Sequence, residues 1–300
     1  MLSFAILALL LFVSCAGWGP GNHLEFEARV WRRRKELLPP KVSALISAER
    51  SAWQYGNIAA DLINFKAFGG HYNHCHRWTI VDEMRALSES PAQEAFCLGY
   101  LAHLAADTIA HNHFVPYHLA RYARGRGLGH LYWEMNADRF VDDERWDVVT
   151  RLKDEPGLTE LDELVNRTVL RKALSMGTNK IIFNHVLLVS ERRRWRDGMA
   201  LIHPLPQVKL SRGFLDMFRD AAVARIVLAL SPGGVTKLAH VDTCGKEAQT
   251  RALTTRQRAM LLTPTQRALR SEARARMFLE GMQTPPPREA GVKAHWAGAE

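Results

Sequence analysis

The chain has 300 residues, 47% of them hydrophobic, and its 40 basic and 31 acidic side chains give a formal charge of +9. This length permits one large or two ordinary domains, and the apolar content suffices for a real core, so a disordered chain and a disulfide-stapled mini-protein are both excluded. The positive charge favours contact with phosphates or an anionic surface without identifying the partner. Nine of the thirteen histidines lie between residues 23 and 130, and a function must explain this clustering.

The beginning of the chain is typical of an export signal. Residues 2–14 form an almost unbroken apolar run that is short for a membrane span, and small residues follow it. We therefore expect residues 1–17 to be a signal peptide and the mature protein to be secreted or periplasmic, with Trp18 as its first residue. Cys15 keeps a second route open, in which the protein is a lipoprotein or stays anchored in the membrane.

The remainder of the chain has helical periodicity, because apolar residues recur at intervals of three and four. Helices are expected at residues 24–38, 41–64, 78–87, 91–109, 119–124, 129–142, 158–176, 181–195, 212–230 and 251–280, with residues 111–116 closing the helix that begins at 91. No alternating strand pattern and no internal repeat appears, so the predicted fold is all-α. The chain also lacks a Gly-rich phosphate loop and a Gly-x-Ser-x-Gly turn, which argues against nucleotide-dependent phosphoryl transfer and serine esterase chemistry.

Two pairs of metal-ligand residues have helical spacing. His103 and Asp107 are four residues apart, which places them on one face of a helix one turn apart, as two ligands of one ion require. His130 and Glu134 repeat this spacing downstream, and His113 follows Asp107 by six residues. One such pair is a weak signal, whereas two pairs with a further histidine between them strengthen the prediction of a metal site.

Three more residues complete the candidate ligand set: His23 near the expected mature start, Asp61 at the end of a helix and His76 in a Gly-rich and His-rich loop. Nitrogen and oxygen ligands without thiolates suit zinc sites that keep positions open for water, and this favours a hydrolytic role over a structural one. His74 stays an alternative to His76. The histidines without a place in this pattern are expected beside the site or on the surface: His71, His74, His111 and His118.

The ligand motifs resemble those of a known family when they are taken together in chain order. They are WGPGNH at 18–23, Asp61 in GNIAADL, His76 in HCHRW, HLAAD at 103–107, His113, and HLYWE at 130–134. The sequence thus resembles the zinc-dependent phospholipase C family, within a superfamily of trinuclear zinc phosphodiesterases. That superfamily also contains single-strand-specific nucleases and the amino-terminal domain of glycosylphosphatidylinositol-specific phospholipase D. The resemblance covers residues 18–145 and is closest to the bacterial phospholipase C-like branch.

The resemblance implies a multi-helix bundle with three zinc ions in a cleft, two ions being the minimum. Asp61, His76, His103 and Asp107 would bind the first ion. The second would be bound by His113, His130 and Glu134. The third would be bound by the amino nitrogen and carbonyl oxygen of Trp18, by His23 and by a shared Asp107. A hydroxide bridging two ions is the implied nucleophile, and the implied catalytic residues are Asp61 and Asp107.

The resemblance gives the expected domain organisation. The zinc-binding core is expected at residues 18–145, a helical completion or extension of unknown role at 146–282, and a disordered tail at 283–300. Phe68 and Tyr72 are the aromatic residues most expected to line a substrate cleft. The predicted helix from Arg251 to Arg276 carries seven arginines against one glutamate, and it either contacts phosphates or is a solvated face.

Three functions are compatible with these residues. We favour a phospholipase C-like hydrolase that cleaves a phospholipid or another phosphodiester, with contact to a membrane surface. The second is a nuclease acting on single-stranded nucleic acid, with bases stacked on aromatic residues. The third is a non-catalytic zinc-binding envelope protein, against which the complete ligand set argues. No protein partner is predicted, and the sequence does not distinguish lipid from nucleic acid as substrate.

Overall fold

The structure is a computed structural model that describes residues 18–63, 75–122, 132–134, 136–169, 174–183 and 210–283. All regular elements in this part of the chain are helices, which confirms the all-α prediction. The expected signal peptide, the loop residues Phe68 and Tyr72, the candidate ligand His130 and the expected tail from residue 284 lie outside the described residues.

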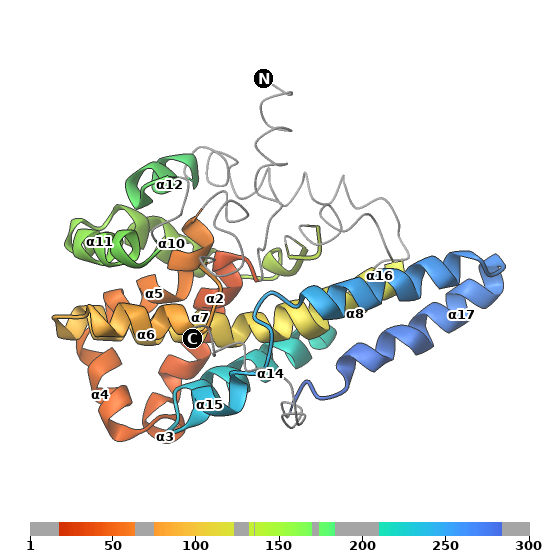
Figure 1. Cartoon of the computed structure of the whole chain (residues 1–300), viewed down its shortest axis with the longest axis horizontal. Helices are drawn as coiled ribbons and strands as arrows, with labels where there is room; N and C mark the ends of the chain where they lie inside the picture. Colours follow the sequence, from red (N-terminus) through yellow and green to blue (C-terminus); the bar gives the residue numbers. More distant parts are fainter. Residues whose placement is uncertain are drawn as a thin grey trace, which may run out of the picture.

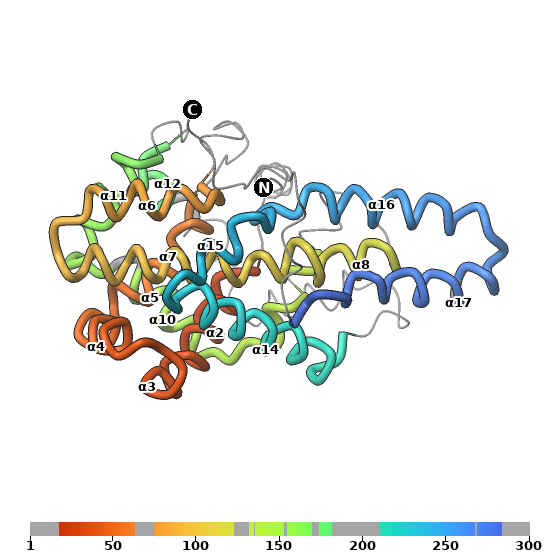
Figure 2. Tube along the Cα trace, turned by 60° about the horizontal axis from the view of Figure 1, so that its bottom comes forward, coloured from red at the N-terminus to blue at the C-terminus, as the bar shows by residue number. Residues whose placement is uncertain are grey.

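The helices are arranged around a long central one, α7, which Figures 1 and 2 both show running through the middle of the molecule. The amino-terminal helices are α2 (Pro20–Arg32), α3 (Arg34–Leu37), α4 (Pro40–Ala48), α5 (Arg50–Leu62), α6 (Thr79–Ala86) and α7 (Pro91–Ile109). A π-helical turn, η2 (Ala110–Phe114), joins α7 to α8 (Val115–Tyr122). The elements that follow are α10 (Asp143–Asp154), η3 (Pro156–Leu158), α11 (Thr159–Thr168), α12 (Met176–Phe183), α14 (Arg212–Ala229), α15 (Gly234–Leu238), α16 (Lys246–Met260), α17 (Pro264–Ala275) and η5 (Arg276–Leu279).

Helix α7 is central because it is apolar or small on nearly every face, so it can bury its whole circumference. Its start is readable in the sequence: the Ser90 side chain accepts a hydrogen bond from the Gln93 amide at 3.2 Å, and Pro91 occupies the first turn. The observed bounds coincide with those predicted for residues 91–109.

Helix α5 approaches α7 closely at a pair of glycines. A Cβ atom built on Gly56 would lie 2.2 Å from the Phe96 carbonyl oxygen, and one built on Gly99 would lie 2.3 Å from the Trp53 carbonyl oxygen. Only glycine tolerates this backbone approach. The contact brings Asp61, one turn after Gly56, alongside the second half of α7, where His103 and Asp107 lie.

Several sequence-based helix boundaries are wrong. The helix predicted at 24–38 is divided at Arg33 into α2 and α3, the one predicted at 158–176 ends at Thr168, and α10 was not predicted. The helix predicted at 41–64 is two helices, because the chain leaves helical geometry at Glu49 between α4 and α5. Residues 111–116 do not close α7, since the π-helical turn carries the chain directly into α8. The single helix predicted at 251–280 is a helical hairpin: Thr263 caps α17 by accepting from the Gln266 amide, and Pro264 begins it.

The carboxy-terminal helices pack on the same core as the amino-terminal ones. The ring of Phe218 in α14 meets Phe114 of the π-helical turn edge to face at 5.2 Å, and the buried Arg219 donates to the Asn22 side chain at 3.0 Å. Helices α16 and α17 pack against α8 and project from the body as an antiparallel pair, shown in blue in Figures 1 and 2. Among the described helices, none has the length and hydrophobicity that crossing a bilayer requires.

Candidate metal centre

Asp107 lies at the centre of a buried group of candidate ligands. It is 0% exposed and extends from the last turns of α7, four residues after His103. Its two carboxylate oxygens face different neighbours, so the carboxylate has a separate set of contacts on each side.

On one side, Oδ2 of Asp107 faces two histidines. It lies 3.2 Å from Nε2 of His76 and 3.3 Å from Nε2 of His103, and these two nitrogens are 3.0 Å apart. The other ring nitrogen of His103 donates to the Asn57 carbonyl oxygen at 2.9 Å, which orients the ring and turns Nε2 toward the carboxylate.

On the other side, Oδ1 of Asp107 faces the amino-terminal end of the described chain. It accepts a hydrogen bond from the backbone nitrogen of Trp18 at 3.1 Å and lies 3.3 Å from Nε2 of His23. His23 is in the first turn of α2, and its ring stacks on His103 at 3.9 Å between centroids. Trp18 is fully buried and fixed by a second hydrogen bond, from Nε1 to the Ala106 carbonyl oxygen at 3.1 Å.

Asp61 lies against both sides. Its Oδ2 is 3.6 Å from Nε2 of His23, and its Oδ1 is 3.9 Å from Nε2 of His103. Its side chain is 6% exposed, whereas those of His103 and Asp107 are 0% exposed. Asp61 is therefore the carboxylate of this group closest to solvent.

The spacing of these atoms fits zinc. Two ligands that each lie about 2.0–2.1 Å from one tetrahedral ion are separated by about 3.3 Å. The separations within the group are 3.0–3.9 Å, and two subsets can each hold an ion, namely His23, Asp61 and His103, and His76, His103 and Asp107. Both ring nitrogens of His23 and Oδ2 of Asp107 are buried without a hydrogen bond of good geometry to any described residue. A bound cation would satisfy such atoms.

The electrostatics of the site favour the protonation states that a cation needs at Asp107 and at His23. At His103 burial lowers the pKa, but the charges of Asp107 and Asp61 outweigh it and raise the pKa overall. Burial alone would raise the pKa of Asp107, but the neighbouring histidines, His103 foremost, hold it well below its usual range. Burial and the neighbouring His103 lower the pKa of His23. A carboxylate that stays ionised beside an imidazole that stays neutral is a suitable donor set for a dication.

The residues predicted to bind the second ion lie further along the chain. His113, in the π-helical turn, is buried, and its Nδ1 donates to the Phe278 carbonyl oxygen at 2.7 Å. Burial, together with the charge of Arg225, lowers the pKa of His113 to about 4, so this imidazole is neutral at neutral pH. Glu134 is 3% exposed, and His130 lies outside the described residues. The assignment of His113, His130 and Glu134 to one ion therefore stays a prediction.

Sequence reasoning missed the residues that form hydrogen bonds to the candidate ligand His76 and to the neighbouring His111. Thr243 donates its hydroxyl to the His76 carbonyl oxygen, and Gln249 donates its amide both to the Cys244 carbonyl oxygen at 3.0 Å and to Nδ1 of His111 at 3.3 Å. Since Nδ1 of His111 accepts, Nε2 carries the proton, and it points at Oδ2 of Asp107 from 3.8 Å. His111 therefore lies beside the site, at a distance from Asp107 that is too long for a hydrogen bond. These contacts come from the segment after residue 240, whose sequence carries no ligand motif.

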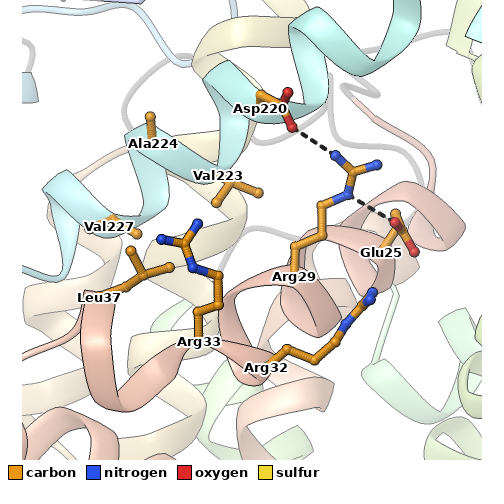
Figure 3. Close-up of a pocket in the computed structure, with 9 residues that line it drawn as sticks. All are labelled: Glu25, Arg29, Arg32, Arg33, Leu37, Asp220, Val223, Ala224 and Val227. Carbon is orange, nitrogen blue, oxygen red and sulfur yellow. Dashed lines mark hydrogen bonds and ion pairs between the residues drawn. The ribbon is translucent and has the colours of Figure 1, made fainter. Parts of the chain in front are cut away.

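A separate surface pocket of about 870 Å³ lies between α2 and α14 (Figure 3). Its guanidinium groups include that of Arg29, which donates to Glu25 at 2.9 Å, to Asp220 at 2.8 Å and to Asp216 at 2.9 Å. These carboxylates neutralise Arg29, and none of the candidate ligands lines the pocket. The pocket is therefore not part of the metal centre.

Comparison with known families agrees with this centre. The family model described as zinc dependent phospholipase C matches residues 22–176, which include every candidate ligand except Trp18. No curated protein and no solved structure matches the chain significantly. The match covers more than half of the chain and contains the buried His and Asp group, and the sequence-based resemblance is thereby confirmed. The chain belongs to the zinc-dependent phospholipase C family.

Proposed function

We propose that this protein is an exported zinc-dependent phosphodiesterase that hydrolyses the headgroup ester of a phospholipid. The observation that carries the proposal is the position of Asp107, whose two oxygens face two groups of ligand atoms at 3.1–3.3 Å. A carboxylate in this position can be shared by two ions, as two-metal hydrolysis of phosphodiesters requires.

We assign the described candidate ligands to two groups. Asp61, His76, His103 and Asp107 would hold one ion, and Trp18, His23 and Asp107 another, while His113, His130 and Glu134 are proposed for the third. Zinc in these positions would supply a hydroxide nucleophile at neutral pH and offset the charge of the phosphate. Asp61 is the most accessible carboxylate of the group, so it is the residue we propose to orient the attacking water and accept its proton.

The proposal includes removal of residues 1–17. Cleavage there would turn the backbone nitrogen of Trp18 into a primary amine, and its position 3.1 Å from Oδ1 of Asp107 supports a role as ligand. Amino-terminal sequencing of the exported protein should then begin at Trp18. A matched form with one extra alanine before Trp18 should bind one zinc fewer per chain. Equal zinc content in the two forms would remove the chain terminus from the site.

The substrate class follows from the family and from the basic character of the chain. Phospholipid is favoured because the family is named for a phospholipase C and because the formal charge of +9 suits an anionic interface. A single-strand nuclease would use the same ligands, so the substrate panel must contain both classes.

The deciding experiment compares wild-type protein with Asp107→Asn and with Asp162→Asn. Asp162 is a matched control because it is also a largely buried aspartate, yet it pairs with Lys180 at 2.5 Å away from the ligand group. We expect wild type and Asp162→Asn to bind two to three zinc ions and to release headgroup phosphate from phospholipid. Asp107→Asn should lose at least one ion and about 100-fold or more in rate.

Other outcomes would change the assignment. Digestion of single-stranded DNA or RNA without phospholipid cleavage would favour the nuclease. Full zinc content and full activity in Asp107→Asn would contradict the proposed centre altogether. Zinc binding without turnover of any phosphodiester would make the protein a metal-binding envelope protein.

A further inference from the structure

Helices α16 and α17 form a projecting hairpin that lies outside the family match and has an exposed apolar tip. The match ends at residue 176, whereas the hairpin occupies residues 246–275. Large apolar side chains are rarely exposed elsewhere in the described residues, yet Met260, Leu261 and Leu269 are 50%, 87% and 72% exposed. Met260 is the last residue of α16, Leu261 follows it in the turn, and Leu269 lies on the solvent-facing side of α17, in its second helical turn. Exposed apolar side chains gathered at one end of an element indicate an interaction surface.

Polar backbone groups at this tip form hydrogen bonds with side chains of the hairpin itself. The Arg267 guanidinium donates to the carbonyl oxygens of Met260 and Leu262 at 3.1 and 3.0 Å, which are groups that the end of α16 would otherwise leave to water. Thr263 accepts from the Gln266 amide at the start of α17. When polar backbone groups already have hydrogen-bond partners within the protein, moving the tip from water into an apolar environment costs less desolvation free energy.

The hairpin is also strongly basic. Residues 251–276 carry seven arginines against the single acidic residue Glu272, and the one other acidic residue of the hairpin is Glu247 at the start of α16. Arg258, Arg270 and Arg274 are exposed and make no hydrogen bond or ion pair with any described residue. An apolar tip flanked by unpaired arginines is complementary to an anionic lipid surface, where guanidinium groups meet lipid phosphates and apolar side chains enter the acyl boundary.

We propose that the α16–α17 hairpin docks this protein onto anionic phospholipid membranes. The inference rests on the proposed function in one respect, since it supplies the surface on which a phospholipid substrate would be met. Helix α16 begins directly after the loop whose Thr243 contacts the His76 carbonyl oxygen, so one rigid helix connects the docking surface with the metal centre.

The test measures flotation of the full-length mature protein with vesicles, which requires no cleavage of the lipid. Vesicles of equal parts phosphatidylglycerol and phosphatidylcholine are compared with vesicles of phosphatidylcholine alone. Wild type should bind the anionic vesicles more tightly, and added salt should weaken this binding. Leu261→Asp should lower the affinity about tenfold. The triple change Arg258→Glu, Arg270→Glu and Arg274→Glu should lower it on the order of 100-fold.

Each variant has a matched control on another face of the molecule. Ile181→Asp changes an apolar side chain that is 58% exposed in α12, far from the hairpin in Figure 1. Lys35→Glu, Lys41→Glu and Lys237→Glu together change the net charge as much as the arginine triple does, at exposed lysines outside the hairpin. Both controls should bind vesicles as wild type does. All variants should keep their zinc and their rate on a short-chain, water-soluble phosphodiester.

The inference is overturned if wild type does not bind anionic vesicles, or if hairpin and control variants bind equally well. If Leu261→Asp only converts a dimer into a monomer, a second copy of the chain covers the tip instead. If the triple arginine variant binds single-stranded DNA more weakly than wild type while its vesicle binding is unchanged, the hairpin binds nucleic acid instead of a membrane. Vesicle binding through the hairpin without turnover of any phosphodiester would leave this inference standing while the proposed function fails.

Discussion

Backbone carbonyl groups set the tautomers of three buried histidines. Nδ1 of His103 donates to the Asn57 carbonyl oxygen at 2.9 Å, and Nδ1 of His113 donates to the Phe278 carbonyl oxygen at 2.7 Å. In both residues Nε2 is left as the nitrogen that can bind a metal. His118 has the same arrangement, with Nδ1 on the Phe114 carbonyl oxygen at 2.6 Å, but no described carboxylate pairs with it. Nε2 of His103, by contrast, lies 3.3 Å from Asp107 and 3.9 Å from Asp61, so a fixed tautomer alone does not make a candidate ligand.

His118 makes a separate prediction about acid stability. Burial lowers its pKa to about 3 from an ordinary value of 6.5. Between these values the unfolded chain binds a proton that the folded chain does not, so stability is complete above about pH 6.5 and falls as the pH drops toward 3. From pH 7 to pH 5 this one group should cost about 2 kcal/mol.

The replacement His118→Phe should remove that loss. Phenylalanine keeps the ring that stacks on Trp133 at 4.0 Å but has no proton to gain. Urea unfolding at pH 7 and at pH 5 measures the loss of stability in both proteins. The candidate metal ligands are the same in wild type and variant, so their contribution cancels when the two losses are subtracted. An equal loss of stability in both proteins would show that His118 is not held neutral in the folded state.

At the scale of elements, the sequence predicted regular helices well and their interruptions poorly. Helix α7 has clear signals at its start, a capping serine and a proline, and its bounds were predicted to the residue. The π-helical turn after α7 has no recognisable sequence pattern, because the one extra residue per turn requires no particular type of amino acid. The hairpin turn did have a signal, since Thr263 and Pro264 are a typical helix start, and the continuous apolar periodicity around them obscured it.

The loop before α16 is the element most sensitive to substitution near the site. Gly245 has a φ of +56°, and a Cβ atom there would lie 2.2 Å from the backbone oxygen of His111. The change Gly245→Ala combines a left-handed backbone with a collision that no side-chain movement relieves. It should lower the free energy of unfolding by at least about 2 kcal/mol and reduce zinc content, since His111 contacts Asp107.

Gly233 provides the matched control for this substitution. It also precedes a helix with a positive φ, +67°, but a Cβ atom there has nothing within 4 Å. Gly233→Ala should therefore lower the free energy of unfolding by only about 1 kcal/mol, the cost of a left-handed backbone for alanine, and leave zinc binding unchanged. Chemical unfolding and metal analysis of the two variants compare these effects. Equal destabilisation would mean that the backbone at His111 moves away from the added Cβ atom at little cost in free energy.

At the scale of the whole molecule, the metal centre depends on segments from both ends of the chain. The sequence predicted the candidate ligands that the structure brings together from α2, α5, α7 and the turn before α6, because ligand chemistry requires particular side chains at particular spacings. It did not predict Thr243, Gln249 or the carbonyl group of Phe278, which support His76, His111 and His113 from the carboxy-terminal helices. A backbone oxygen has no side-chain identity, so a contact of this kind leaves no pattern in the sequence.

Because the candidate ligands come from separate segments, bound zinc should stabilise the entire fold. The ions would connect Trp18 and His23 near the amino terminus to Asp107 in the central helix. Removing zinc with a chelator should lower the melting temperature, and an ion present at 1,000 times its Kd contributes about 4 kcal/mol. Zn²⁺ should restore stability and Mg²⁺ should not, because imidazole nitrogens suit zinc and Mg²⁺ prefers oxygen ligands. Asp107→Asn is the control, since it lacks the shared carboxylate and its melting temperature should fall less on addition of chelator than that of wild type. A chelator effect of equal size in wild type and Asp107→Asn would place the stabilising ion elsewhere in the protein.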